Sequence, residues 1–169
     1  MTARAVLFAI AFVPMLLEAR RSASNDRRLR AKGAIEPAAD VYRLMQVAYP
    51  GCFLAMIAEA WVRGPGGTGF AVVGGVVFAA SKALKYWAIA TLGERWTFRV
   101  LVPPGSNRIV RGPYAYLRHP NYVAVAGELV GFALIARAPI AGAIAVTCFG
   151  VLMLARIRVE ERALGMRTR

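Results

Sequence analysis

Five apolar stretches constrain the fold of this chain more than any other feature of its sequence. They span roughly residues 3–18, 44–62, 67–90, 122–136 and 139–155, and a helix needs about 20 apolar residues to cross a bilayer. None of them shows the alternation of a membrane β-strand, whereas a helix satisfies its backbone polar groups internally. The sequence therefore predicts an all-α integral membrane protein with about five transmembrane helices, of which the first and the fourth are short.

Composition and charge agree with a membrane protein. Hydrophobic residues make up 58% of the chain and the mean hydropathy is +0.49, which excludes an ordinary soluble domain. The net charge is +13. If successive helices alternate in direction, Arg4, Arg63 and Arg137 lie on one side of the membrane and the other basic residues on the opposite side. The positive-inside rule then places the N-terminus outside and the C-terminus in the cytoplasm.

The same charge distribution indicates which molecules the protein is expected to bind. A basic face at the membrane surface is expected to contact anionic lipid headgroups. A nucleic-acid-binding protein more often carries a continuous basic stripe on a soluble module, so we expect no nucleic-acid partner. The oligomeric state is left open.

The chain is predicted to form a single domain over residues 1–169. Residues 1–81 are expected to supply membrane helices and a basic surface loop at 20–43, and residues 82–169 the core of the functional site. Because its positive charge falls mainly after the apolar stretch, the first segment is interpreted as a retained helix and not as a cleaved signal peptide.

Small residues and cysteines within the apolar stretches are interpreted as packing residues. Gly75 and Ala79 lie one turn apart and predict a close approach of the third helix to a neighbour. Cys52 and Cys148 show neither metal-ligand spacing nor a disulfide framework. We therefore expect no metal site.

The last two apolar stretches are predicted to form a helical hairpin, because only Arg137-Ala-Pro139 separates them. Its two open ends must then return to the same side of the membrane. Both ends carry charge: residues 111–122 at the start of the hairpin, and residues 156–162 at its end. The hairpin therefore predicts that two polar clusters meet.

His119, the only histidine, is the first candidate for chemistry in these clusters. Pro120 follows it and biases its backbone away from a helix, so the imidazole is expected at the start of the fourth segment. Either a ligand-binding role or a hydrogen-bonded histidine at the membrane interface fits this position. Tyr114, Tyr116 and Tyr122 are likewise ligand contacts or members of an interfacial aromatic belt.

Acidic and basic residues near the membrane supply further candidates. Arg156 and Glu160 share one helix face, and they are interpreted either as ligand contacts or as a surface ion pair. Glu59 and Glu128 lie inside apolar stretches, where an ionisable group is costly and a functional candidate by default. Buried interhelical hydrogen bonds explain them equally well.

At this point the chain resembles the isoprenylcysteine carboxyl methyltransferase family and the related membrane phospholipid methyltransferases. The resemblance covers about residues 82–165, and no single motif carries it alone. It rests on Gly112-x-Tyr114, Arg118-His-Pro-Asn-Tyr122 and Arg156-x-x-x-Glu160-Glu161, preceded by Trp87-Ala-x-x-Thr-Leu-Gly-x-x-Trp-Thr97. The short length, the Lys32-Gly-Ala loop and Asn121 resemble most a bacterial branch thought to O-methylate alkylpyrones or related phenolic lipids.

The resemblance implies S-adenosylmethionine bound at the cytosolic end of the last helices, and a lipophilic acceptor that enters from the bilayer. By position, the cofactor contacts implied are Tyr114, His119, Pro120, Asn121, Tyr122, Glu160 and the stretch from Ser106 to Ile109, where a histidine expected near Ser106 is absent. Arg156 matches the acceptor-side arginine of the family. His119 is implied either as a base or as a cofactor contact.

These residues suit methyl transfer, because displacement at a sulfonium depends mainly on positioning, which contributes roughly 7–11 kcal/mol. We therefore expect a methyltransferase of the bacterial inner membrane that faces the cytoplasm and acts on a carboxylate, enol or phenol oxygen. Two alternatives remain: N-methylation of a phospholipid, and a small membrane transporter or adaptor without turnover.

Overall fold

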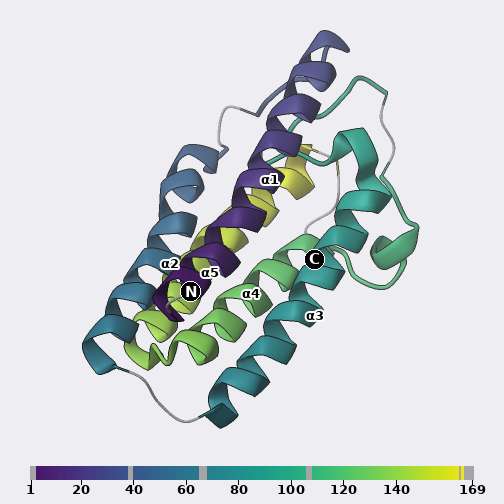
Figure 1. Ribbon diagram of the computed structural model, residues 1–169. Helices are drawn as coiled ribbons and strands as arrows, with labels where there is room; N and C mark the ends of the chain where they lie inside the picture. Colours follow the sequence, from purple (N-terminus) through teal and green to yellow (C-terminus); the bar gives the residue numbers. More distant parts are fainter. Residues whose placement is uncertain (1–2, 38–39, 65–67, 106–107, 164, 166–169) are drawn as a thin grey trace.

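The computed structural model describes residues 3–37, 40–64, 68–105, 108–163 and 165, which form a bundle of five α-helices (Figure 1). The helices are α1 (Ala3–Ala31), α2 (Tyr42–Arg63), α3 (Thr68–Leu92), α4 (Pro120–Ala136) and α5 (Pro139–Ala163). Two 3-10 turns, η1 (Gly93–Arg95) and η2 (Gly112–Ala115), lie between α3 and α4. The described residues contain no β-strand beyond one isolated bridge between Ile35 and Val102. The predicted all-α fold is confirmed.

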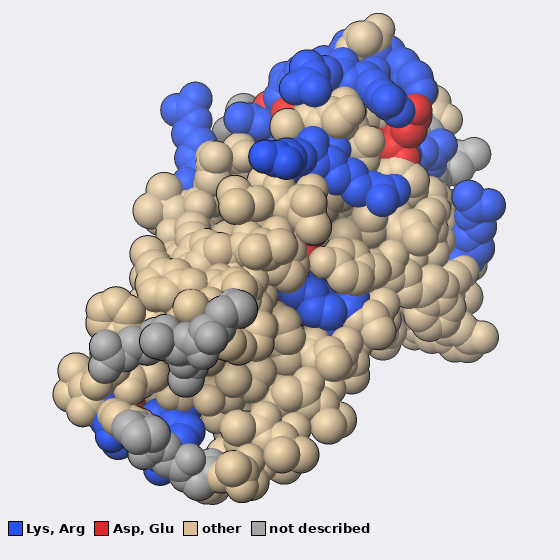
Figure 2. All heavy atoms as spheres, viewed as in Figure 1, with Lys and Arg blue, Asp and Glu red and all other residues tan. Residues whose placement is uncertain are grey.

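About five transmembrane helices were predicted, and three spans of the described residues are long and apolar enough to cross a membrane: Tyr42–Arg63, Thr68–Arg95 and Pro139–Ala163. Helix α1 is not among them. The fourth helix is apolar but has only 17 residues, as its short apolar stretch predicts. Lys and Arg side chains gather at the upper end of the bundle in Figure 2, around the C-terminal half of α1. This end is called the basic end below.

The first helix departs from the prediction. The segment 20–43 was expected to be a surface loop, yet α1 continues through Ala31, so that expectation is wrong for residues 20–31. The reason lies in tertiary contacts. Asn25 donates to the carbonyls of Gly93 (3.1 Å) and Trp96 (2.8 Å), and the amide of Phe98 donates to Ser22 Oγ (2.7 Å). The polar half of α1 is therefore held on the segment that follows α3.

Helices α3 and α4 approach each other most closely where neither has a side chain to separate them. A Cβ on Gly131 would lie 2.6 Å from the backbone nitrogen of Phe78, and one on Gly74 would lie 2.7 Å from the carbonyl oxygen of Gly131. The prediction of a small-residue contact on α3 is right in kind but wrong in position. Gly75 has open space around it and Ala79 is exposed.

Aromatic side chains fill the centre of the bundle. Phe53 of α2 packs edge-on against Phe132 of α4, with ring centroids 4.8 Å apart, and Phe78 of α3 packs against the same ring.

The two cysteines are free. Cys52 is half-buried, but Cys148 is exposed, so the prediction that Cys148 packs in the interior is wrong.

The end of the bundle opposite to the basic end is closed by Glu59. Its carboxylate accepts from the backbone amides of Ile140 (3.3 Å) and Ala141 (2.6 Å) at the start of α5. A carboxylate is favourable there because the first amides of a helix lack partners and carry partial positive charge. Glu59 therefore holds α5, as the interhelical alternative predicts.

The α3–α4 contact gives a test of the fold. We expect Gly131→Ala to lower the free energy of unfolding by roughly 1–3 kcal/mol, because the added methyl group overpacks the helix contact. The matched change Gly75→Ala enters open space and is expected to stabilise the helix slightly. Denaturant unfolding in detergent measures both. Equal effects of the two substitutions would contradict the packing described here.

Candidate functional site

The open ends of the α4–α5 hairpin bring the two predicted polar clusters together. His119 Nε2 lies 3.1 Å from Glu161 Oε1, and the Tyr122 hydroxyl donates to Glu160 Oε2 at 2.9 Å. His119 precedes α4 with φ −135° and ψ 63°, outside the helical region, as expected for a residue before proline. The predicted meeting of residues 119–122 with residues 160–161 is therefore confirmed.

The Arg156 guanidinium does not form the surface ion pair with Glu160 that the spacing allowed. It is buried, and its three nitrogens donate to three different segments. Nε donates to the Tyr122 hydroxyl (3.1 Å), one terminal nitrogen to Asp40 Oδ1 (2.7 Å) and the other to the carbonyl of Phe98. Arg156 therefore connects α5 to α4 and to the two segments that lie before α2 and after α3.

Asp40 is the residue of this network that the sequence interpretation missed. Its side chain is almost fully buried, and besides Arg156 it accepts from the backbone amides of Val100 (2.9 Å) and Tyr42 (3.1 Å). The available signal was an aspartate just ahead of an apolar helix, a position at which the side chain often accepts from the first free amides. That signal does not reveal an arginine 116 residues away.

A cavity of about 630 Å³ connects these groups to the interior of the bundle, within the size range of sites for small molecules. Of the predicted site residues it is lined by Ile109, Tyr114, His119, Asn121, Tyr122, Arg156 and Glu160. Pro120 is buried as the first residue of α4, and Ser106 lies outside the described residues. The other walls include Met15, Leu16, Met45, Pro50, Val125 and Phe149, which are apolar. The cavity thus joins a polar end to an apolar lobe.

The polar end of the cavity is rich in hydrogen-bonding groups. Burial, together with the nearby charge of Glu160, raises the pKa of Tyr114 far above its ordinary value. Its phenol therefore remains protonated and can act as a donor at physiological pH. The Trp96 indole nitrogen lies 3.5 Å from Asn121 Oδ1. The guanidinium carbon of Arg99 lies over the ring of Tyr42, 4.3 Å from the ring centroid.

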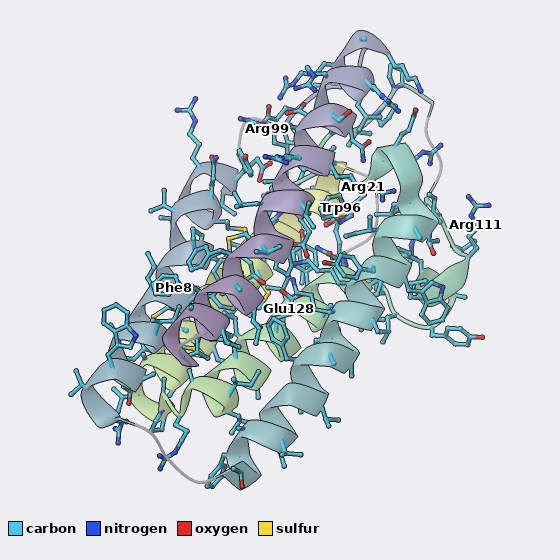
Figure 3. All side chains as sticks on the ribbon, in the orientation of Figure 1. Phe8, Arg21, Trp96, Arg99, Arg111 and Glu128 are labelled. Carbon is cyan, nitrogen blue, oxygen red and sulfur yellow. The ribbon has the colours of Figure 1, made fainter. Side chains whose placement is uncertain are left out.

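A second charged cluster lies deeper in the bundle, where α1, α3 and α4 meet (Figure 3). Glu18 pairs with Lys82 (2.8 Å) and Lys85 (2.7 Å), and Glu128 lies 3.2 Å from each of the same two lysines. The hydroxyl of Tyr49 donates to Glu128. Glu128 therefore takes part in interhelical contacts, which is one of the two interpretations given for it from the sequence.

Removal of Asp40 tests the Arg156 network. We expect Asp40→Ala to lower the free energy of unfolding by about 3–5 kcal/mol, because it leaves a buried guanidinium without its counter-charge. Glu94→Ala breaks exposed ion pairs with Arg28 and Lys32 and is expected to have little effect. Thermal unfolding of the purified proteins compares the two; a Glu94 variant as unstable as the Asp40 variant would argue against a special role of the network.

Comparison with known proteins assigns the chain to a family. Residues 72–166 match the isoprenylcysteine carboxyl methyltransferase (ICMT) family. YpbQ, an uncharacterized protein of Bacillus subtilis, is 29% identical over 159 residues, which cover 94% of this chain and 95% of YpbQ. An uncharacterized protein of Haemophilus influenzae is 26% identical over 163 residues, which cover 95% of this chain and 92% of that protein. No solved structure matches. Because the family match covers more than half of the residues, this integral membrane protein belongs to the isoprenylcysteine carboxyl methyltransferase family, a family of membrane methyltransferases.

Proposed function

We propose that this protein transfers a methyl group from S-adenosylmethionine to an oxygen atom of a lipophilic acceptor dissolved in the membrane. One observation carries the proposal: a single cavity combines a polar end, lined by His119, Tyr122 and Glu160, with an apolar lobe lined by α1, α2, α4 and α5. A charged cofactor and an apolar acceptor need these two environments side by side.

The polar end suits the cofactor. Glu160 offers carboxylate oxygens to the ribose hydroxyls or the ammonium group, and Tyr114 and Asn121 add a phenol and an amide. We assign cofactor contacts to Ile109, Tyr114, His119, Pro120, Asn121, Tyr122 and Glu160. Bound there, S-adenosylmethionine supplies an electrophilic methyl group. The chain itself contributes position, which is the largest need of such a displacement.

His119 and Arg156 have different tasks in this proposal. His119 Nε2 lies 3.1 Å from Glu161 Oε1, and its Nδ1 lies 3.9 Å from Glu160 Oε2, so the Nδ1 side of the ring faces the carboxylate that is assigned to the cofactor. Arg156 already donates to Asp40, Phe98 and Tyr122. It therefore acts mainly by holding the cavity wall in place and by adding a fixed positive charge beside the acceptor.

The charge distribution supports the proposed location. Figure 2 shows Lys and Arg side chains concentrated around one end of the bundle, and this end also holds the polar part of the cavity. A basic surface is favoured on the cytoplasmic side of a membrane and is attracted by anionic lipids. We accordingly propose an active site that faces the cytoplasm from a bacterial inner membrane. Residues 1–81 supply the wall toward the acceptor and residues 82–169 most cofactor contacts.

Calorimetric titration with S-adenosylhomocysteine tests the cofactor site. We expect Glu160→Gln to weaken binding roughly 10- to 100-fold, since a hydrogen bond to a charged group contributes about 1.5–3 kcal/mol. Tyr116→Phe is the control, because Tyr116 lies outside the cavity and is 82% exposed. The absence of binding to folded wild-type protein would remove the methyltransferase proposal and favour a transporter or adaptor.

The methylated atom is tested with labelled S-adenosylmethionine added to membranes that contain the protein. We expect the label in a lipophilic product that carries an O-methyl group. Arg156→Ala, in protein that still binds S-adenosylhomocysteine, is expected to reduce incorporation. Label in methylated phosphatidylethanolamine would contradict the O-methyl assignment and support the phospholipid alternative.

A further inference from the structure

The deep charged cluster is not explained by cofactor binding. It comprises Glu18 from α1, Lys82 and Lys85 from α3, Glu128 from α4 and Tyr49 from α2, with the distances given above. Glu128 is fully buried and Lys85 is 2% exposed. Figure 3 places Glu128 in the middle of the bundle, well below Trp96 in that view. Ionisable groups inside a membrane protein are costly, and they commonly mark a site of function.

Two members of the cluster, Lys85 and Tyr49, line the same cavity as His119 and Glu160. Glu128 follows Tyr122 by six residues on α4, so it lies about 9 Å further along the helix axis. The surrounding walls are apolar, with Val125 and Phe149 among them. A molecule in the apolar lobe therefore meets an ammonium and a phenol at this depth.

The existing contacts of Tyr49 leave its hydroxyl oxygen able to accept one more hydrogen bond. Its hydroxyl donates to Glu128, and a hydroxyl oxygen can still accept a hydrogen bond from a second molecule. The Lys85 ammonium lies 5.4 Å from the centroid of the Tyr49 ring, close enough to stabilise negative charge that develops beside the phenol. Lys85 is paired with Glu18 and Glu128, so a proton taken up by Glu128 leaves part of the ammonium charge uncompensated. The three nitrogens of Arg156, in contrast, keep their partners Asp40, Phe98 and Tyr122.

The charge balance of the cluster selects the ligand. Glu18 and Glu128 compensate Lys82 and Lys85, so the cluster is neutral when all four groups are ionised. An anion that entered as such would be uncompensated in a medium of low polarity. A neutral molecule with an acidic O–H group avoids this cost, because its proton can pass to a carboxylate of the cluster and leave the total charge unchanged.

We propose that Tyr49, Lys85 and Glu128 form the subsite that binds the acidic hydroxyl of the lipophilic acceptor, an enol or a phenol, and takes up its proton. The acceptor O–H bond breaks and an O–H bond forms on Tyr49. The original Tyr49 proton moves to Glu128, and the oxygen anion left on the acceptor faces the Lys85 ammonium. This inference rests on the proposed function, because it names the acceptor class of the same cavity.

The test uses 4-dodecyl-2-nitrophenol, a phenol with a long apolar chain whose phenolate absorbs at longer wavelength than its phenol. The probe is titrated into detergent-purified protein at a pH at which it is mostly protonated in protein-free micelles. We expect a saturable phenolate band with wild-type protein. Tyr49→Phe should weaken binding roughly tenfold through the lost hydrogen bond, while the unfolding temperature changes little.

A charge-balanced pair of variants separates the subsite from general electrostatics. The double variant Lys85→Met with Glu18→Gln removes one charge of each sign from the cluster and is expected to abolish the phenolate band. The double variant Lys32→Met with Glu94→Gln removes an exposed ion pair of 2.6 Å and is expected to leave the band unchanged. If the first double variant does not fold, the affinity of the probe for Tyr49→Phe alone tests the subsite.

The outcomes distinguish the two proposals. A non-saturable signal, or a band with wild-type affinity in folded Tyr49→Phe and in the Lys85–Glu18 variant, would overturn the subsite. A band with the expected variant pattern, but without methyl transfer from S-adenosylmethionine to any lipid, would support the subsite and remove the proposed activity.

Discussion

The guanidinium of Arg156 connects four segments of the basic end that are distant from one another in the sequence. Its partners are Asp40 ahead of α2, Phe98 after α3 and Tyr122 on α4, and Arg156 itself belongs to α5. A buried cation requires an anion and full hydrogen bonding, and Asp40 supplies the anion. The walls of the cavity are therefore fixed relative to one another by one side chain. Asp40 also binds the amide of Val100, which extends this constraint into the segment between α3 and α4.

Two clusters of charge at different depths then define the cavity. At the basic end, Tyr122 and His119 meet Glu160 and Glu161. Deeper in the bundle, two glutamates are balanced by two lysines. The apolar lobe lies between helices that contribute to one cluster or the other, and α4 contributes to both. Such an arrangement offers a polar end to a charged molecule and a water-poor lobe to an apolar one, where electrostatic interactions are stronger than in water.

The sequence predicts the part of this structure that depends on chain connectivity. A two-residue connection forces α4 and α5 to run antiparallel, so residues 119–122 and 160–161 had to meet. It also gives interhelical contact as one of two interpretations of Glu128, because an isolated carboxylate is too costly in an apolar bundle. In both cases a local pattern leaves few physical alternatives.

The features that the sequence did not reveal depend on long-range contacts. Apolar patterning cannot show that α1 continues past its apolar half, because Ser22 and Asn25 are stabilised there by backbone groups more than 60 residues away. The partner of Asp40 is equally remote. The choice of Gly74 over Gly75 depends on which face of α3 meets α4, and a helix that is apolar all round does not define that face.

The tip of the α4–α5 hairpin carries a further consequence. Arg137 adopts a left-handed conformation, with φ 53° and ψ 44°, at a position where glycine is usual. An arginine there resists entry into lipid and so anchors the tip at the headgroup level. The 17 residues of α4 measure about 26 Å along the helix axis, slightly less than the hydrocarbon thickness of about 30 Å. The length of the hairpin thus sets a depth: if Arg137 is held at one surface of the membrane, His119 at the other end of α4 lies near the opposite surface.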